Sequence, residues 1–132
     1  MLKAFTFRGG IHPDDCKKST KDNKIIEISP SKMMVYPVVQ HIGAPCVPIV
    51  KVGGDVLKGQ KIADIDAFVS APIHSSVSGK VIAIEKRRHP NGNMVESIVV
   101  ENDNLYRLSP DICRRDGIDK LTKDEKLKII RE

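Results

Sequence analysis

Histidine and cysteine are the residue types in this 132-residue sequence that could hold a metal ion. His12 lies shortly before Cys16, and His41 shortly before Cys46, so each pair could offer an imidazole and a thiolate to a soft metal. Neither pair has the usual zinc spacing, and no second pair follows closely in sequence. We therefore expect no metal site, with His12 capping a turn and His41 making a hydrogen bond at a strand end.

The run His74-Ser75-Ser76 raises the possibility of a serine nucleophile with a histidine base. Adjacent residues of a strand point to opposite faces, so His74 is badly placed to deprotonate Ser75. No oxyanion-hole glycine motif is evident. We expect these hydroxyls to bond the backbone of a hairpin, and we predict no catalytic residue.

Composition bounds the remaining function classes. The net charge is +5, yet the only dense basic patch is Lys86-Arg87-Arg88-His89, and no aromatic residues interleave with it, which argues against nucleic acid. Every apolar run is too short to span a membrane, and residues 1–10 lack the apolar stretch of a signal peptide. The three isolated cysteines favour reduced thiols. These features predict a cytoplasmic location.

Short Val- and Ile-rich runs bounded by Gly and Pro predict a mainly β fold. Pro37 marks residues 33–42 as an edge or bulged strand. Asn91-Gly92 is a strong hairpin signal. Further strands are expected over residues 46–52, 62–65, 81–85 and 94–101, with turns at Gly53-Gly54-Asp55 and Lys58-Gly59. Two similar strand–turn–strand halves would close as a flattened barrel around one Val/Ile core.

The two ends of the sequence differ from this pattern. Residues 1–32 predict an N-terminal arm packed on the body and pinned by Ile25, Ile26 and Ile28. Residues 33–106 form the predicted barrel, and residues 107–132 a helical linker. In the linker, Ser109-Pro110 predicts a helix start, and Thr122 with Glu125 predicts a capping box. Because that second helix carries Leu127 and Ile130 on one face and stops at Glu132, we expect it to lead into a further domain.

One part of the barrel resembles a known class of carrier domain. The segment GGDVLKGQKIADI and the later VSGKV resemble the two half-motifs of biotinyl and lipoyl domains, which are barrel-sandwich hybrids that display a modified lysine at a hairpin tip. That lysine would fall near Val69 or Ser70, but no lysine lies between Lys61 and Lys80. Acylation needs a primary amine. The resemblance thus implies the barrel-sandwich hybrid fold without lipoylation or biotinylation.

A second resemblance covers nearly the whole chain. FTFRGGIHP, QHIGAPCVPIVKVGGDVLKGQKI, FVSAPIHSSVSGKVIAIE, HPNGNMVESIVVEND and LTKDEKLKIIRE resemble the N-terminal region of RnfC, the C subunit of the Rnf-type electron-transport complex. The resemblance implies a peripheral subunit, on the cytoplasmic side of the membrane, of an ion-translocating ferredoxin:NAD oxidoreductase. It also implies FMN, NAD and two [4Fe-4S] clusters in the full-length protein, none of which has its motif here.

Two surfaces are candidates for contact with partners. The first is the hairpin tip made of Phe68, Val69, Ser70, Ala71 and Pro72, which lose little conformational entropy when ordered at an interface. The alternative is that Phe68 folds back to plug the barrel end. The second is the basic patch of Lys86, Arg87 and Arg88, which could steer an acidic electron carrier such as ferredoxin, or else form a solvated turn.

Three hypotheses for function follow. The first is a non-catalytic structural and docking domain that binds other subunits of the membrane electron-transport complex. The second is a carrier-like module that binds a small cofactor non-covalently at its tip. The third is the same module in a related NADH:quinone reductase or a soluble reductase chain. An enzymatic activity is not expected of this chain alone.

Overall fold

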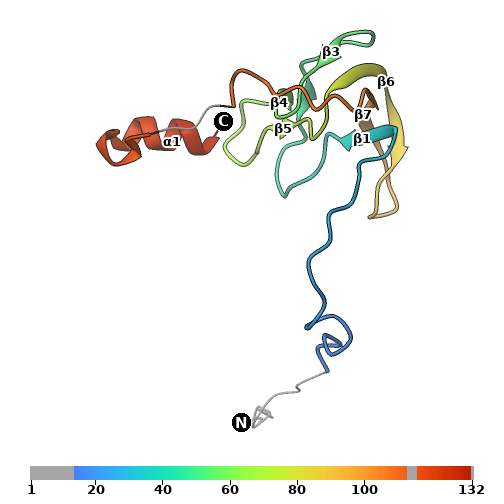
Figure 1. Ribbon diagram of the computed structural model, residues 1–132. Coiled ribbons are helices and arrows are strands. Elements are labelled where there is room, and N and C mark those ends of the chain that lie inside the picture. The colour runs from blue at the N-terminus through green and yellow to red at the C-terminus, as the bar shows by residue number, and fades with distance from the viewer. Residues whose placement is uncertain (1–13, 113–115, 132) are drawn as a thin grey trace, which may run out of the picture.

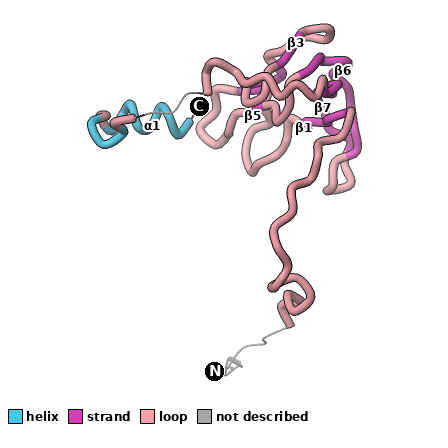
Figure 2. Tube along the Cα trace, in the orientation of Figure 1, coloured by secondary structure: helices cyan, strands magenta, loops and turns pink. Residues whose placement is uncertain are grey.

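The computed structural model describes residues 14–112 and 116–131. Its body is mainly β and contains two antiparallel sheets (Figures 1 and 2). The first sheet has the strand order β1-β7-β6-β3, and the second has the order β2-β4-β5. The strands are β1 (Met33–Pro37), β2 (Val47–Pro48), β3 (Asp55–Val56), β4 (Lys61–Asp64), β5 (Ile73–His74), β6 (Gly79–Arg88) and β7 (Met94–Asn102).

Both sheets contribute to one core of branched aliphatic side chains. Val81 and Ile98 come from the first sheet, Ile62 comes from the second, and all three are fully buried. The other buried members of this cluster are Tyr36, Val38, Cys46, Val56, Ala63, Ile73, Val77 and Val100. Two small sheets that share one core make a barrel-sandwich hybrid, so the predicted fold class is confirmed.

Local turn chemistry accounts for the long hairpin of β6 and β7. The turn at Asn91-Gly92 is closed by hydrogen bonds from the His89 N–H to the Asn93 carbonyl (2.8 Å) and from the Gly92 N–H to the His89 carbonyl (2.8 Å). The two strands pair in register from Gly79 opposite Asn102 to Arg88 opposite Met94, with a bulge between Val81 and Ala83. The predicted hairpin is confirmed, and β6 runs beyond its predicted end.

Proline limits the strands of the first half of the barrel. β1 pairs only with β7 and ends at Pro37, as an edge strand should. The strand predicted over residues 46–52 is shorter than expected, because β2 covers only Val47–Pro48. Pro48 has no N–H to donate to a ladder, which limits the length of regular pairing.

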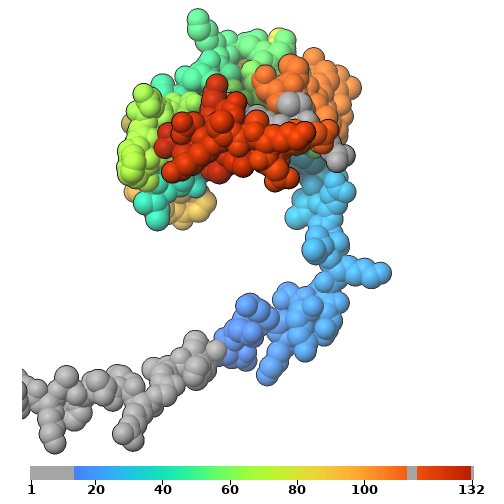
Figure 3. Space-filling model, turned by 90° about the vertical axis from the view of Figure 1, so that its left-hand side faces the viewer, coloured from blue at the N-terminus to red at the C-terminus, as the bar shows by residue number. Residues whose placement is uncertain are grey.

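The segments that flank the barrel are largely exposed. Ile25, Ile26 and Ile28 are 103%, 78% and 82% exposed, so they do not pin the arm as the sequence had suggested. Residues 14–30 extend away from the barrel (Figures 1 and 3). The chain attaches at Lys32, whose carbonyl accepts the Asn102 N–H (2.8 Å). The division into arm, barrel and linker stays a prediction.

Beyond the barrel, the chain forms a 3-10 turn, η1 (Ile118–Lys120), and one helix, α1 (Lys123–Arg131). The predicted capping box of α1 is confirmed: the Glu125 N–H donates to Thr122 Oγ1 (3.3 Å), and the Thr122 N–H donates to Glu125 Oε2 (2.8 Å). The helix start predicted at Ser109 is not seen within residues 109–112. There the Ile112 N–H closes a single turn on the Ser109 carbonyl (3.1 Å), because the Ser109 N–H is committed to Lys58 (2.9 Å).

Candidate functional site

The predicted hairpin tip, residues 68–72, lies on the loop between β4 and β5. Phe68 is 101% exposed and Val69 is 52% exposed. The alternative in which Phe68 plugs the end of the barrel is therefore wrong. Ser70 and Pro72 are half-buried, so the tip presents its two apolar side chains outward while its second half contacts the body.

The tip is held by a second loop, residues 41–46, which we call the brace loop. The Ala44 N–H donates to the Val69 carbonyl (3.0 Å). The Ala71 N–H donates to His41 Nε2 (3.3 Å), which also lies 3.1 Å from Ser70 Oγ. The buried Cys46 Sγ donates to the Ala71 carbonyl (3.1 Å). Backbone and side-chain contacts together fix the tip, which is not a free loop.

Gly43 permits the closest approach between the two loops. Its φ is +131°, and a Cβ placed on it would lie 2.1 Å from the Val69 carbonyl oxygen. No other residue type could occupy this position without moving the tip backbone. The two motifs QHIGAP and SAPIHSS, distant in sequence, therefore meet at one end of the barrel.

His41 and Cys46 serve the tip through hydrogen bonds. In the described residues, no three His, Cys, Asp or Glu side chains gather closely enough to hold a metal ion. His41 Nε2 does approach a carbonyl of its own loop, that of Ala44 (3.2 Å), but its partners Ser70 and Ala71 lie 29 and 30 residues away. Spacing in the sequence could not reveal these partners. His12, predicted to cap a turn, lies outside the described residues.

The run His74-Ser75-Ser76 behaves as predicted. Ser75 is 2% exposed, and its Oγ donates to the Val77 carbonyl (2.7 Å). The Ser76 N–H donates to the hydroxyl of Tyr36 (3.1 Å), and the exposed His74 is not hydrogen-bonded to Ser75. The two serines stabilise the barrel, and the expected hydroxyl-to-backbone bonding is confirmed at Ser75.

The predicted basic patch lies on the β6–β7 hairpin, on a different side of the barrel from the tip (Figure 1). Arg87 forms an ion pair with Glu85 (2.6 Å), and Lys86 stands opposite Glu96 in the strand register. Lys86 and Arg88 are exposed or half-exposed. Two carboxylates thus offset much of the positive charge, and the patch is a weaker attractor for an acidic partner than its sequence suggests.

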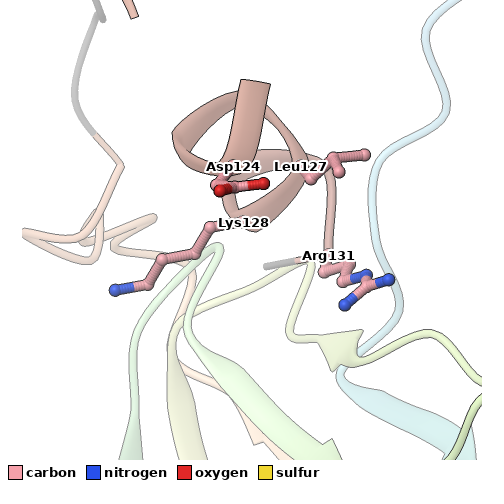
Figure 4. A pocket seen from close by; sticks show the side chains of 4 residues that line it. All are labelled: Asp124, Leu127, Lys128 and Arg131. Atoms are coloured by element: carbon pink, nitrogen blue, oxygen red, sulfur yellow. The ribbon is translucent and has the colours of Figure 1, made fainter. Parts of the chain in front are cut away.

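A hollow of about 430 Å³ lies beside the tip. It is bordered by Phe68, Ser70 and Pro72, by the carboxylates of Asp64 and Asp66, and by Arg131 at the end of α1. A hydrogen bond from Lys61 Nζ (2.8 Å) lowers the pKa of Asp64. A shallower depression lies on α1 itself, where Leu127 is flanked by Asp124, Lys128 and Arg131 (Figure 4). Neither hollow was predicted.

A flattened β-barrel whose tip carries no lysine defines a barrel-sandwich hybrid that cannot be acylated there. The family model described as the RnfC barrel sandwich hybrid domain matches residues 5–105. The chain belongs to this family.

The relatives are C subunits of ion-translocating oxidoreductase complexes. The chain is 47% identical over 111 residues to that of the Na(+)-translocating ferredoxin:NAD(+) oxidoreductase complex of Acetobacterium woodii, covering 84% of this chain and 25% of that protein. It is 49% identical over 133 aligned positions to that of the proton-translocating ferredoxin:NAD(+) oxidoreductase complex of Clostridium ljungdahlii, covering 100% and 28%. That of the ion-translocating oxidoreductase complex of Rhodobacter capsulatus is 38% identical, covering 86% and 22%. The chain thus spans about a quarter of the length of these relatives.

Proposed function

We propose that this chain is a structural and docking domain of RnfC, within an Rnf-type ion-translocating ferredoxin:NAD oxidoreductase. The observation that carries the proposal is the tip: Phe68 is fully exposed, yet the loop beneath it is fixed by the brace loop. An apolar side chain presented on a fixed backbone loses little conformational entropy when a partner covers it. The names of the relatives, all subunits of oxidoreductase complexes, support a partner within such a complex.

The redox chemistry of the proposed complex belongs elsewhere in it. FMN, NAD and two [4Fe-4S] clusters are expected in the full-length protein, by resemblance. The described residues contain no grouping of metal ligands that fits a cluster, so we derive no electron-transfer step through them. We place the domain on the cytoplasmic face as a peripheral element. Within residues 14–112 and 116–131, no helix is long and apolar enough to cross a membrane.

The second candidate function is a carrier-like module with a non-covalently held cofactor. The hollow beside the tip favours it, because a space of about 430 Å³ falls in the range that small ligands occupy. Ferredoxin contact at the basic patch is a weaker proposal, since Glu85 and Glu96 offset that charge.

Co-purification with an absorption spectrum tests the docking function. We expect an affinity-tagged copy of the chain, produced in cells that contain the complex, to retain other subunits of that complex. The purified chain itself should show no absorption band above about 350 nm, where flavins and iron–sulfur clusters absorb. Failure to retain any subunit contradicts docking, and a bound chromophore that leaves on denaturation favours the carrier-like module.

A further inference from the structure

The brace loop adds a third apolar side chain to the exposed surface of the tip. Ile42 is 93% exposed, beside Phe68 at 101% and Val69 at 52%. Ile42 and Val69 sit on backbones joined directly by the Ala44–Val69 hydrogen bond and the Gly43 approach. We call these three side chains the apolar knob. One exposed apolar residue is ordinary on a protein surface, but three on two mutually fixed loops form a surface suited to binding.

Several polar contacts hold this knob in place. Gly43 has no side chain where the Val69 carbonyl occupies the space, while His41 and the buried Cys46 bond the backbone that follows Val69. A loop needed only to connect β4 to β5 would not require a partner loop. Preorganisation of this kind raises affinity by removing the entropy cost of ordering the surface on binding.

The charge around the knob selects the class of partner. The sequence contains no Lys or Arg from residue 33 to 50 or from 62 to 79, the two stretches that hold both loops. Lys61, which directly precedes the second stretch, is paired with Asp64 (2.8 Å). Asp66 is exposed and has no hydrogen bond or ion pair with any described residue. A surface meant for anionic lipid would carry basic residues at its border, and this one carries acidic residues.

One cation of the chain already faces these carboxylates. Arg131 of α1 borders the same hollow as Asp64 and Asp66. The hollow beside the knob is therefore compatible with a guanidinium or ammonium group, which is what a complementary partner would place there.

We propose that the apolar knob of Ile42, Phe68 and Val69 inserts into an apolar pocket of a partner protein, and that Lys or Arg side chains at the pocket's border meet Asp66. This inference rests on the proposed docking function and adds the contact residues and the chemistry of the partner surface. A membrane surface is the competing occupant, and the experiment below separates the two.

Site-specific photo-crosslinking in the assembled complex tests the proposal directly. We would place benzoylphenylalanine at position 42, 68, 88 or 94, one position per variant, and irradiate cells that contain the complex. We expect positions 42 and 68 to crosslink to one protein, at a peptide that contains both apolar residues and Lys or Arg. Crosslinks at 88 or 94 only would overturn the knob and leave docking intact. Absence of protein crosslinks at all four positions would overturn both.

Matched variants measure the contribution of the knob. Phe68→Ser should weaken co-purification of partner subunits by about 30-fold, the scale of a single hot-spot residue. Met94→Ser, which removes a 58% exposed side chain from the other hairpin, should change it less than about three-fold. Equal effects of the two would contradict the proposal. Both side chains are exposed, so neither change should unfold the barrel; thermal unfolding checks this.

The acidic border is tested by charge reversal. Asp66→Lys should weaken binding at low salt, and the loss should shrink as the salt concentration rises, because the lost attraction is electrostatic. Asp55→Lys, at an exposed carboxylate on β3, is the control and should bind as the unaltered chain does. No effect of Asp66→Lys would refute the cationic border. Sedimentation of the chain with vesicles of phosphatidylglycerol and phosphatidylcholine, if abolished by Phe68→Ser, would assign the knob to the membrane and overturn the protein pocket.

Discussion

At the scale of single residues, His41 shows how a side chain with metal-binding chemistry serves structure instead. Its Nε2 accepts the Ala71 N–H (3.3 Å) and lies within hydrogen-bonding distance of Ser70 Oγ (3.1 Å). A ring nitrogen that accepts a backbone N–H fixes the position of that backbone relative to the brace loop. The identity of this residue therefore matters to the geometry of the tip.

Replacement of His41 tests this role. We expect His41→Ala to speed amide hydrogen exchange at Ala71, because the N–H loses its acceptor, and to reduce the free energy of unfolding by about 1 kcal/mol. Exchange followed by NMR gives the first quantity, and urea denaturation gives the second. His74→Ala is the control, since His74 is exposed on the same β4–β5 hairpin and should alter neither. Unchanged exchange at Ala71 in His41→Ala would rule out the brace.

At the scale of elements, the sequence predicts local features well and the pairing of distant loops poorly. Asn91-Gly92 predicts the β6–β7 hairpin and Thr122 with Glu125 predicts the start of α1, because each signal acts within a few residues. Nothing local indicates that Ala44 bonds Val69 or that Lys58 bridges Leu108. Such contacts depend on how the closed barrel brings the loops together. For the same reason the tip was predicted as a candidate surface, and Ile42 was missed.

Two glycines offer a comparison that isolates the contact between the loops. Gly43 (φ +131°) lies against the Val69 carbonyl, whereas Gly53 (φ +87°) has nothing within 4 Å of where a Cβ would be. We expect Gly53→Ala to cost about 1 kcal/mol of stability, from backbone strain alone. Gly43→Ala adds a steric clash and should cost about 3 kcal/mol or more. Urea denaturation of both variants measures the difference. Equal costs would mean that the tip yields easily and is not held by the brace loop.

At the scale of the whole molecule, the chain that leaves β7 returns to close the barrel. The Lys58 N–H donates to the Arg107 carbonyl (2.8 Å), and the Asp103 N–H donates to the Ser78 carbonyl (3.1 Å). Motif resemblance identified the barrel-sandwich hybrid correctly, because GGDVLKGQKIADI and VSGKV carry the turns of both halves. It did not predict this closing segment, whose contacts again join residues far apart in sequence.

Asp103 makes this closure dependent on pH. Its carboxylate accepts hydrogen bonds from Ser78 Oγ (2.6 Å), the Leu105 N–H (2.8 Å) and Arg107 Nη2 (2.8 Å). The first of these contributes most to lowering its pKa below the ordinary 3.8. A carboxyl whose pKa is lowered on folding stabilises the protein fully above its unfolded-state pKa, and that contribution is lost as the pH falls through the folded-state pKa.

Asp103→Asn should therefore reduce the free energy of unfolding at pH 7, and the gap between the two proteins should close as the pH falls below about 4. Urea denaturation at several pH values measures this gap. Asp66→Asn is the control, because that exposed carboxylate has no hydrogen-bonding partner among the described residues, and its gap should stay near zero throughout. A gap for Asp103→Asn that does not depend on pH would mean that the shape of the side chain, and not its charge, closes the barrel.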